Sequence, residues 1–453
     1  MSMPDDNIAV AQRILNDFGN VIKTQDDREL VVIDKDGKIQ NEDVCNWCPD
    51  DKKVTNSVLR SRIEPWLTAL FQSEHLSLLC GSGISNAISY IANGTAGASM
   101  ATVSFDRFEP LVKDAADISA KASGREKANI EDQIRIANDL LRGYKILKRS
   151  STAAELEKIL NDIITSFAKS ILTGEKGIAT ATKEKREAAL SVLVNFILSF
   201  VSRTGSRERL NIFTTNYDRL IEVGAELAGI HLMDRFVGTI MPVFRSSRLN
   251  LDMHYNPPGI RGEPRYLEGV ARLTKLHGSV DWIQIYNEIR RIGLPFGAID
   301  IEPFLKAPGL DKADPLKMMI YPNSAKDRET AEYPYVELFR DFAAAICRPN
   351  STLVTYGYSF GDDHINRVIK DMLTIPSTHL VVISYNDLIG RILKFYQEVA
   401  QHTQMSLLIG NNLGDITNLV HDYLPKPAID RNTIRMAELL QHRMGASSTS
   451  HPT

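Results

Sequence analysis

Residues 76–85, Leu-Ser-Leu-Leu-Cys-Gly-Ser-Gly-Ile-Ser, join a short apolar run to a glycine-rich turn. We expect Leu76–Cys80 to form a buried strand, and the residues after the turn, through Ala92, to form a helix. A strand, a glycine turn and a helix in this order begin a doubly wound α/β fold. Gly81 and Gly83 would let the backbone approach a pyrophosphate, which the amides at the helix start would face. A tight packing turn is the alternative explanation of the same glycines.

Further short apolar runs downstream indicate a parallel sheet. Most of them end in Gly, Asn, Ser or His, as fully buried strands of a parallel sheet do. Ligands bind beyond the carboxyl ends of such strands. This rule groups the residues that follow the runs, namely Gly81, Asn216, His277, Gly357 and Ser384. The runs are Asn211–Thr215, Leu273–Leu276, Met318–Tyr321, Thr352–Tyr356, Leu380–Ile383 and Ser406–Ile409.

Changes of composition along the chain predict four parts. The sheet domain, a Rossmann-like parallel α/β unit, is expected to comprise residues 71–105 and 206–425. Long charged, alanine-rich and leucine-rich stretches with helical periodicity predict a large helical insertion over residues 106–205. Residues 1–70 form an N-terminal extension, with a helix at 8–18 and a hairpin signal at 30–39. Residues 426–453 are expected to hold a C-terminal helix and a disordered tail.

The overall composition is that of an ordinary soluble protein. The chain has 453 residues, of which 43% are hydrophobic and 24% charged, and a formal net charge of -3. This balance indicates no general attraction to nucleic acid or to an anionic membrane. The most apolar long stretch, Ala188–Val201, is too short to span a bilayer, and Met1–Val10 shows no signal peptide. We therefore expect a cytoplasmic protein.

Two polar motifs follow predicted strands. In Thr214-Thr215-Asn216-Tyr217-Asp218, the Asn can orient a ribose hydroxyl or a water molecule, and the Asp can accept from an amide. The alternative is an Asx turn that caps the helix Arg219–Leu227. In Lys275-Leu276-His277-Gly278-Ser279, the His is a candidate general base. Its alternative is a strand-end histidine with a structural hydrogen bond.

A third motif, Tyr356-Gly357-Tyr358-Ser359-Phe360-Gly361-Asp362-Asp363-His364, also begins at a strand end. Ser359 can bond a phosphate or a ribose. The last three residues are expected at a helix N-terminus, which favours acidic side chains. Cys45 and Cys48 form a lone Cys-x-x-Cys without two further ligands, so a turn or core role is expected. We predict no metal site.

The order of these four motifs resembles the sirtuin family. The resemblance covers roughly residues 74–390, leaving aside the helical insertion, and is strongest to the bacterial sirtuin-like proteins of antiphage defence. It implies that Asn216 positions the nicotinamide ribose and the attacking water, and that Asp218 lies near the nicotinamide amide. His277 would act as base or ribose contact.

The same resemblance implies where the rest of NAD+ lies. The loop that begins at Gly81 would line one side of the diphosphate, and the loop that begins at Gly357 would line the other side. The residues after strand 380–383 would contact the adenosine ribose. The implied NAD+ contacts are Gly81, Ser82, Gly83, Ser85, Thr215, Gly357, Ser359, Ser384 and Asn386.

Two departures from the sirtuin deacylases shape the functional prediction. Deacylases carry two Cys-x-x-Cys zinc motifs between the Asn and Gly-Ser regions, and this chain has none there. They also continue the first turn with Gly-Ile-Pro-Asp-Phe-Arg, where this chain has Asn86-Ala87-Ile88-Ser89-Tyr90. We therefore predict an NAD+ hydrolase that releases nicotinamide and ADP-ribose and defends bacteria against phage by NAD+ depletion. An NAD+-dependent protein deacylase and a non-catalytic NAD+ or ADP-ribose sensor are the alternatives.

An NAD+ hydrolase needs control, and fewer than 70 residues follow Asn386, which is short for a sensor domain. Control by assembly is therefore expected, as a homo-oligomer or with a separate protein. The layout resembles the sirtuin-like subunit of two-gene (Nezha-type) systems whose partner is a HerA-type ATPase. The apolar stretch Leu190–Phe200 or the N-terminal segment would supply the interface, or would only fill the local core.

Overall fold

A computed structural model shows how the predicted elements are arranged. It describes residues 5–24, 29–40, 47, 53–97, 101–122, 127–202, 208–246, 252–255, 265–286, 288–306, 309–310 and 334–426. The predicted strand Met318–Tyr321, the Cys45–Cys48 motif and the predicted C-terminal helix and tail lie outside these residues.

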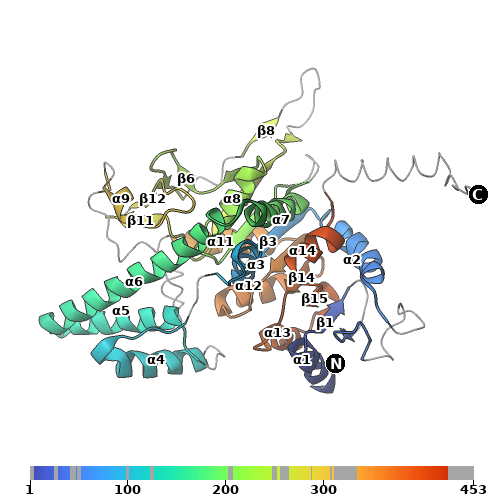
Figure 1. Ribbon diagram of the computed structural model, residues 1–453, viewed down its shortest axis with the longest axis horizontal. Helices are drawn as coiled ribbons and strands as arrows, with labels where there is room; N and C mark the ends of the chain where they lie inside the picture. Colours follow the sequence, from blue (N-terminus) through green and yellow to red (C-terminus); the bar gives the residue numbers. More distant parts are fainter. Residues whose placement is uncertain are drawn as a thin grey trace, which may run out of the picture.

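A nine-stranded sheet forms the centre of the molecule (Figure 1). Seven neighbouring strands are parallel, and the two at one edge are antiparallel. The predicted Rossmann-like α/β fold is therefore confirmed. Across the sheet the strands follow the order β2 (Val31–Ile33), β1 (Asn20–Lys23), β15 (Met405–Gly410), β14 (His379–Ser384), β13 (Ser351–Tyr356), β3 (His75–Cys80), β4 (Asn211–Thr214), β10 (Val270–Lys275) and β5 (His231–Met233).

The order in which the strands are added to the sheet reverses at the pair β3 and β13, although these two strands are parallel. From β3 the chain continues to β4 on one side, and it later returns to place β13 on the other side. Connections that leave a strand pair in opposite directions open a crevice at the carboxyl ends. The loops that begin at Gly81 and Gly357 lie at this crevice, because they follow β3 and β13 directly.

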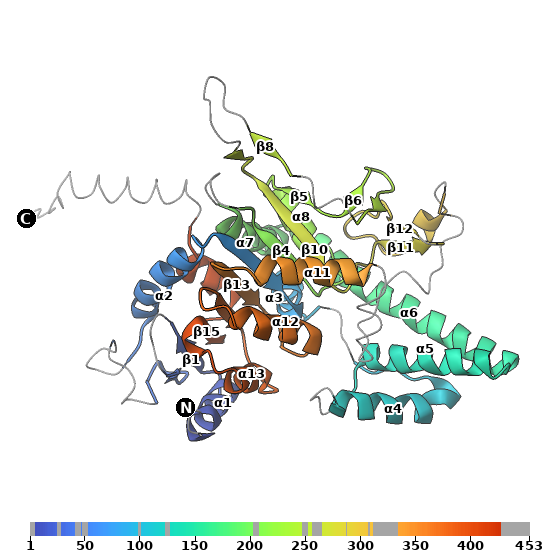
Figure 2. The ribbon, with the colours of Figure 1, turned by 180° about the vertical axis from the view of Figure 1, so that it is seen from behind.

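Helices cover both faces of the sheet because successive strand residues point to opposite sides. In β3, Leu78 and Cys80 belong to one core, and Leu79 belongs to the other. Figure 1 looks onto the first face and Figure 2 onto the second. The first face carries α2 (Asn56–Leu70), α3 (Ser82–Asn93), α7 (Lys183–Val201) and α8 (Leu220–Leu227); the second carries α1 (Asp5–Asn16), α11 (Tyr335–Ile346), α12 (Asp363–Leu373) and α13 (Arg391–Glu398).

Helix α7 is a layer of this α/β unit. Leu193, Phe196, Ile197 and Phe200 are fully buried in the core of the first face. The stretch Leu190–Phe200 is expected either to form an interface or to fill the local core. These four side chains fill the local core.

The helices before α7 form a projecting arm (Figure 1). The apolar core of the arm includes Phe105, Ile134 and Leu160, and it continues into a cluster with Tyr217 and Ile283 outside the arm. An Asn129–Asp132 capping box starts its second long helix. The arm consists of the short helix η2 (Asp106–Phe108), α4 (Glu109–Ala122), α5 (Ile130–Ile146) and most of α6 (Ser150–Ala179), whose later part packs on α3.

The N-terminal segment adds strands β1 and β2 to the sheet edge beside β15. The predicted hairpin is present as β2 and an antiparallel bridge between Ile33 and Ile39, with Gly37 at a positive φ of 82°. Smaller elements complete the described chain: β6 (Phe236–Val237), β7 (Val243–Phe244), β11 (Trp282–Ile285) and β12 (Glu288–Arg291) in one small sheet, β8 (His254–Tyr255) and β9 (Arg265–Tyr266) in another, and α9 (Glu302–Leu305), η5 (His402–Gln404), α14 (Ile416–Asn418) and the π-helical turn η6 (Leu419–Tyr423). Among the described helices, none is long and apolar enough to cross a membrane.

Candidate functional site

The glycines of the two strand-end loops are packed against each other. The Gly83 amide donates to the Gly357 carbonyl over 3.0 Å. A Cβ added at Gly83 would lie 2.5 Å from the Gly357 Cα, and one added at Gly81 would lie 2.5 Å from the Gly357 oxygen. Gly357 itself has a φ of +59°. These glycines are therefore tightly packed, and this packing brings the two loops to the base of one crevice.

Two adjoining cavities open at the carboxyl end of the sheet. The first has a volume of about 330 Å³ and the second of about 630 Å³. Five residues line both: Ser82, Asn86, Tyr358, Ser359 and Arg391. All twelve predicted site residues line one cavity or both. Gly81, Ser85, Thr215, Asn216, Asp218 and His277 line the first, Gly83, Gly357, Ser384 and Asn386 the second, and Ser82 and Ser359 both.

Asn216 is held in one orientation by its amide nitrogen. The Nδ2 group donates to the Gly81 carbonyl and to the Ser85 Oγ, both over 2.9 Å. Asn216 is buried, with 9% of its surface exposed. Its carbonyl Oδ1 accepts no hydrogen bond from another described residue. This oxygen is therefore the part of the side chain that can accept from a ligand hydroxyl or a water molecule.

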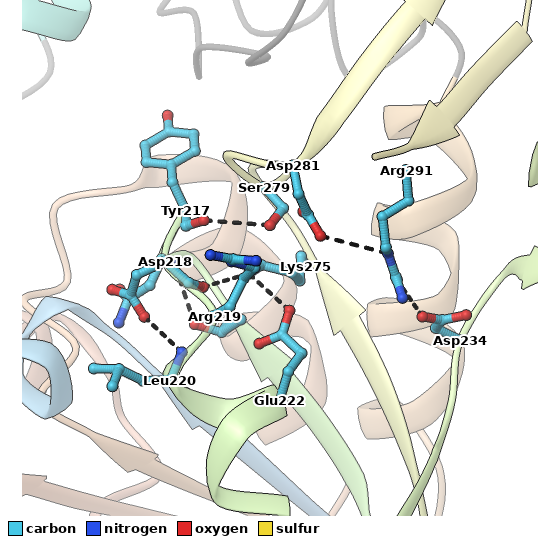
Figure 3. A network of polar contacts seen from close by, with 12 residues as sticks. Tyr217, Asp218, Arg219, Leu220, Glu222, Asp234, Lys275, Ser279, Asp281 and Arg291 are labelled. Carbon is cyan, nitrogen blue, oxygen red and sulfur yellow. Dashed lines mark hydrogen bonds and ion pairs between the residues drawn. The ribbon is translucent and has the colours of Figure 1, made fainter. Parts of the chain in front are cut away.

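A buried lysine holds the loop that carries Asn216 (Figure 3). Lys275, on β10, donates to the main-chain carbonyl of Asp218 and, over 3.0 Å, to the Glu222 carboxylate. The Asp218 carboxylate accepts from the Ser85 hydroxyl and from the Leu220 amide. Asp218 thus forms an Asx turn just before α8, whose N-cap is Arg219, and it also lines the first cavity.

His277 pairs with a carboxylate from the Gly357 loop. The distance from His277 Nε2 to Asp362 Oδ2 is 2.9 Å, and each residue has 8% of its surface exposed. The other oxygen of Asp362 accepts from the His364 amide and caps α12, as expected for a helix N-terminus. A carboxylate of this kind orients an imidazole and stabilises its protonated form. The sequence motif contained Asp362, but its contact with His277 joins residues 85 positions apart.

The helical arm contacts the Asn216 loop at two points. Glu175 of α6 forms a buried ion pair with Arg219 and also accepts from the Arg219 amide over 2.8 Å. Glu131 of α5 accepts a hydrogen bond from the Tyr217 hydroxyl over 2.9 Å. Both carboxylates line the first cavity. Burial raises the pKa of Glu175, and the charge of Arg219 opposes that effect.

Carboxylates line both cavities: Asp387 and Asp415 line the second, and a larger number line the first. Five carboxylates line the first cavity: those of Glu131, Asp132, Glu175, Asp218 and Asp362. Among the described lining residues, Arg391 is the one guanidinium, and it lies where the cavities meet. A Cβ at Gly361 would lie 2.6 Å from an Arg391 nitrogen, so this glycine makes room for the guanidinium. Such a site suits a ligand that is cationic at one end and anionic in its middle.

No sequence motif indicated Arg391 or Glu131. Arg391 opens α13, beyond the last motif, and Glu131 is one acid among many in a charged helical stretch. Both become site residues only through the packing of α13 and α5 against the crevice.

The second cavity is rimmed by exposed apolar side chains. Tyr90, Tyr385, Leu388 and Ile389 line it with 68%, 49%, 67% and 65% of their surfaces exposed. Ser384 donates to the Asn386 carbonyl over 2.7 Å, which shapes the loop after β14. Apolar side chains around a small polar floor are typical of sites for flat, partly apolar ligands.

The part of the chain described by the structure contains no group of three or more His, Cys, Asp or Glu side chains that could hold a metal ion. Cys80 is buried and Cys347 is half-buried, and both are free thiols. Burial raises the pKa of both thiols, which opposes formation of a thiolate ligand.

Comparison with known proteins finds a similarity for part of this chain. A search of the curated proteins finds no match. Residues 210–404 match the family model of the SIR2-like domain, which covers somewhat less than half of the chain. The matched segment contains Asn216, His277 and the Gly357 loop. Residues 210–404 are thus similar to a SIR2-like domain, and domains of this family bind NAD+ and are in general NAD+-dependent enzymes.

Proposed function

We propose that this protein hydrolyses NAD+ at the bond between nicotinamide and ribose. The observation that carries the proposal is the orientation of Asn216. Its amide nitrogen is fixed by Gly81 and Ser85, while its carbonyl oxygen is left for a ligand in the cavity that His277 also lines. This arrangement suits a ribose or a water molecule held for attack.

The two cavities accommodate the two halves of NAD+ in this proposal. The nicotinamide ribose, which carries the positive ring, occupies the acidic first cavity. The adenosine occupies the second, larger cavity with its apolar rim. The diphosphate lies at the junction, against Ser82, Ser359 and Arg391.

The reaction needs no group beyond the substrate and water. The bond from C1′ to the nicotinamide nitrogen breaks, and both electrons go to that nitrogen, which makes the leaving group neutral. The oxygen of a water molecule held by Asn216 bonds to C1′, and its proton passes to His277. Asp362 stabilises the imidazolium that forms. The products are nicotinamide, ADP-ribose and a proton.

The arm supports hydrolysis over deacylation. Residues of α5 and α6, among them Glu131, Phe167 and Glu175, form part of the wall of the first cavity. Carboxylates in this wall favour a cationic nicotinamide ring over the neutral acyl group of an acyl-lysine. Water is then the nucleophile.

We further propose that the hydrolase acts in bacterial antiphage defence, where depletion of NAD+ stops an infected cell. Its control would come from assembly with copies of itself or with a HerA-type ATPase. The exposed side chains of Leu111 and Ile118, with 55% and 71% of their surfaces exposed, support assembly, since they lie seven residues apart on one face of α4.

The test is release of nicotinamide from NAD+ by the full chain, alone and co-purified with the protein encoded beside it. Each reaction is run with and without an acyl-lysine peptide. Hydrolysis predicts equal rates with and without the peptide, and loss of release in Asn216→Ala and His277→Ala. Release that requires the peptide would identify a deacylase, and binding of NAD+ without release would identify a sensor.

A further inference from the structure

One acidic group in the first cavity differs from the others in its partners. Glu131 is half-buried at the start of α5 and lines the cavity with Asn216 and His277. Among the described residues, its only hydrogen bond comes from the neutral Tyr217 hydroxyl. The Tyr217 ring lies beside the His277 ring, with a distance of 6.4 Å between their centroids. No lysine or arginine in the described part of the chain forms an ion pair with this carboxylate.

The remaining carboxylates of the cavity are already engaged. Asp132 closes the capping box of α5 with Asn129, and Glu175 pairs with Arg219. Asp218 accepts from a serine hydroxyl and a main-chain amide, as described above, and Asp362 pairs with His277. These contacts give four of the five acids a cationic or main-chain partner, and Glu131 has neither among the residues that the structure describes.

We infer that Glu131 is a catalytic residue of this site, contributed by the helical arm, whose carboxylate contacts the nicotinamide ribose and stabilises the positive charge that develops at C1′. The inference rests on the proposed function. Loss of nicotinamide passes through a state in which the ribose resembles an oxocarbenium ion. An anion fixed in a partly dehydrated cavity stabilises such a state more than water does.

The pKa of the Glu131 carboxyl group is raised overall, which by itself favours the neutral form when no ligand is bound. Burial raises the pKa of the carboxyl group, while the charge of His277 and the hydrogen bond from Tyr217 lower it. Asp362 and Asp132, which also face Glu131, act in the same direction as burial. A cationic ligand in the cavity would favour the ionised form of the Glu131 carboxyl group. By the same attraction, the carboxylate would stabilise a positive charge that develops on the ligand.

The arm would then complete the active site rather than only cover it. The experiment measures kcat and KM for nicotinamide release by the full chain, prepared in whichever form is active. Glu131→Gln keeps the size of the side chain and removes its charge. We expect kcat to fall on the order of 100-fold, with KM changed much less and the Tm unchanged or raised.

Two matched variants separate catalysis from structure. Asp139→Asn changes an exposed carboxylate of the same helix that lines neither cavity, and it should leave both kcat and the Tm near their wild-type values. Tyr217→Phe keeps the Glu131 charge but removes its hydrogen bond, and should lower kcat by about fivefold.

A Glu131→Gln protein that turns over as fast as the wild type, with the wild-type Tm, would overturn this inference alone. An equal loss of kcat in Asp139→Asn would also overturn it, because the effect would then come from the helix and not from the Glu131 charge. Failure of the wild-type protein to release nicotinamide, alone or with its genomic neighbour, would instead overturn the proposed function and this inference with it.

Discussion

Replacement of Asp362 by Asn tests whether the His277–Asp362 contact serves chemistry. The change keeps the shape of the side chain and removes the negative charge 2.9 Å from His277 Nε2. Asn caps a helix as well as Asp does, so the hydrogen bond from the His364 amide that starts α12 can persist. The fold should therefore tolerate the substitution, and the loss should be confined to the histidine.

The magnitude follows from the burial and charge of this contact. A hydrogen bond to a charged group is worth about 1.5–3 kcal/mol when its environment excludes water. Both residues are 8% exposed, so solvent offers little compensation. If the imidazolium forms in the transition state, Asp362→Asn should lower kcat by about 10- to 100-fold.

The assay is steady-state release of nicotinamide from NAD+, with thermal unfolding measured on the same preparations. Asp363→Asn is the matched control, since its exposed carboxylate lies one residue along the helix and faces solvent. The control should keep the wild-type kcat. A wild-type kcat in Asp362→Asn would refute the reasoning, and so would a fall in kcat that the Asp363 control shares.

Three further substitutions test other parts of the structure. Gly83→Ala would place a Cβ 2.5 Å from the Gly357 Cα, so we expect a lower Tm in thermal unfolding and weaker NAD+ binding in calorimetry; an unchanged Tm would show that the two loops are not locked together. Arg391→Met should raise the KM for NAD+ at least tenfold with a smaller change in kcat, because it removes the guanidinium at the junction of the cavities, and an unchanged KM would rule out a diphosphate contact. Burial lowers the pKa of His379 to about 4, where its ring contacts Ser406. Below pH 6.5, His379 therefore binds a proton in the unfolded chain but stays neutral in the folded chain. Acidification from pH 6.5 to 4 should lower the free energy of unfolding by about 3 kcal/mol. Denaturant unfolding of His379→Asn should lack this part of the pH dependence, and an identical pH dependence in both proteins would contradict it.

The fold was predictable where local patterns agree with tertiary packing. Short apolar runs ending in polar residues correctly indicated β3, β4, β10, β13, β14 and β15, since parallel strands buried on both faces need continuous apolar side chains. Edge strands lack that signature. The pairing of β1 with β15, across almost 400 residues of sequence, depends on where the sheet leaves an open edge, and no local pattern records it.

The site was predictable where a strand end fixes the position of a side chain. Asn216 and His277 follow neighbouring parallel strands, so their proximity in one cavity follows from the topology. The contributions of Glu131, Glu175 and Arg391 depend on how helices pack over that edge. Helix packing depends on side chains distributed along whole helices, so the identity of any one residue does not indicate it.

The resemblance to sirtuins and the geometry of the glycine loops address different questions. The resemblance suggested that Gly81 and Gly83 contact a diphosphate, whereas the structure gives both a packing role against Gly357. The two roles are compatible, because close packing of the loops is what brings Ser82 and Ser359 to the rim shared by the two cavities.

The most direct test of the central claim is proton NMR of NAD+ mixed with the full chain and its genomic neighbour, followed over time beside the Asn216→Ala variant. We predict that the wild-type protein converts NAD+ into nicotinamide and ADP-ribose in equal amounts without any acyl peptide. The variant, which loses the oriented carbonyl, should leave NAD+ intact. NAD+ that stays intact with the wild-type protein, or is cleaved equally fast by the variant, would contradict the account.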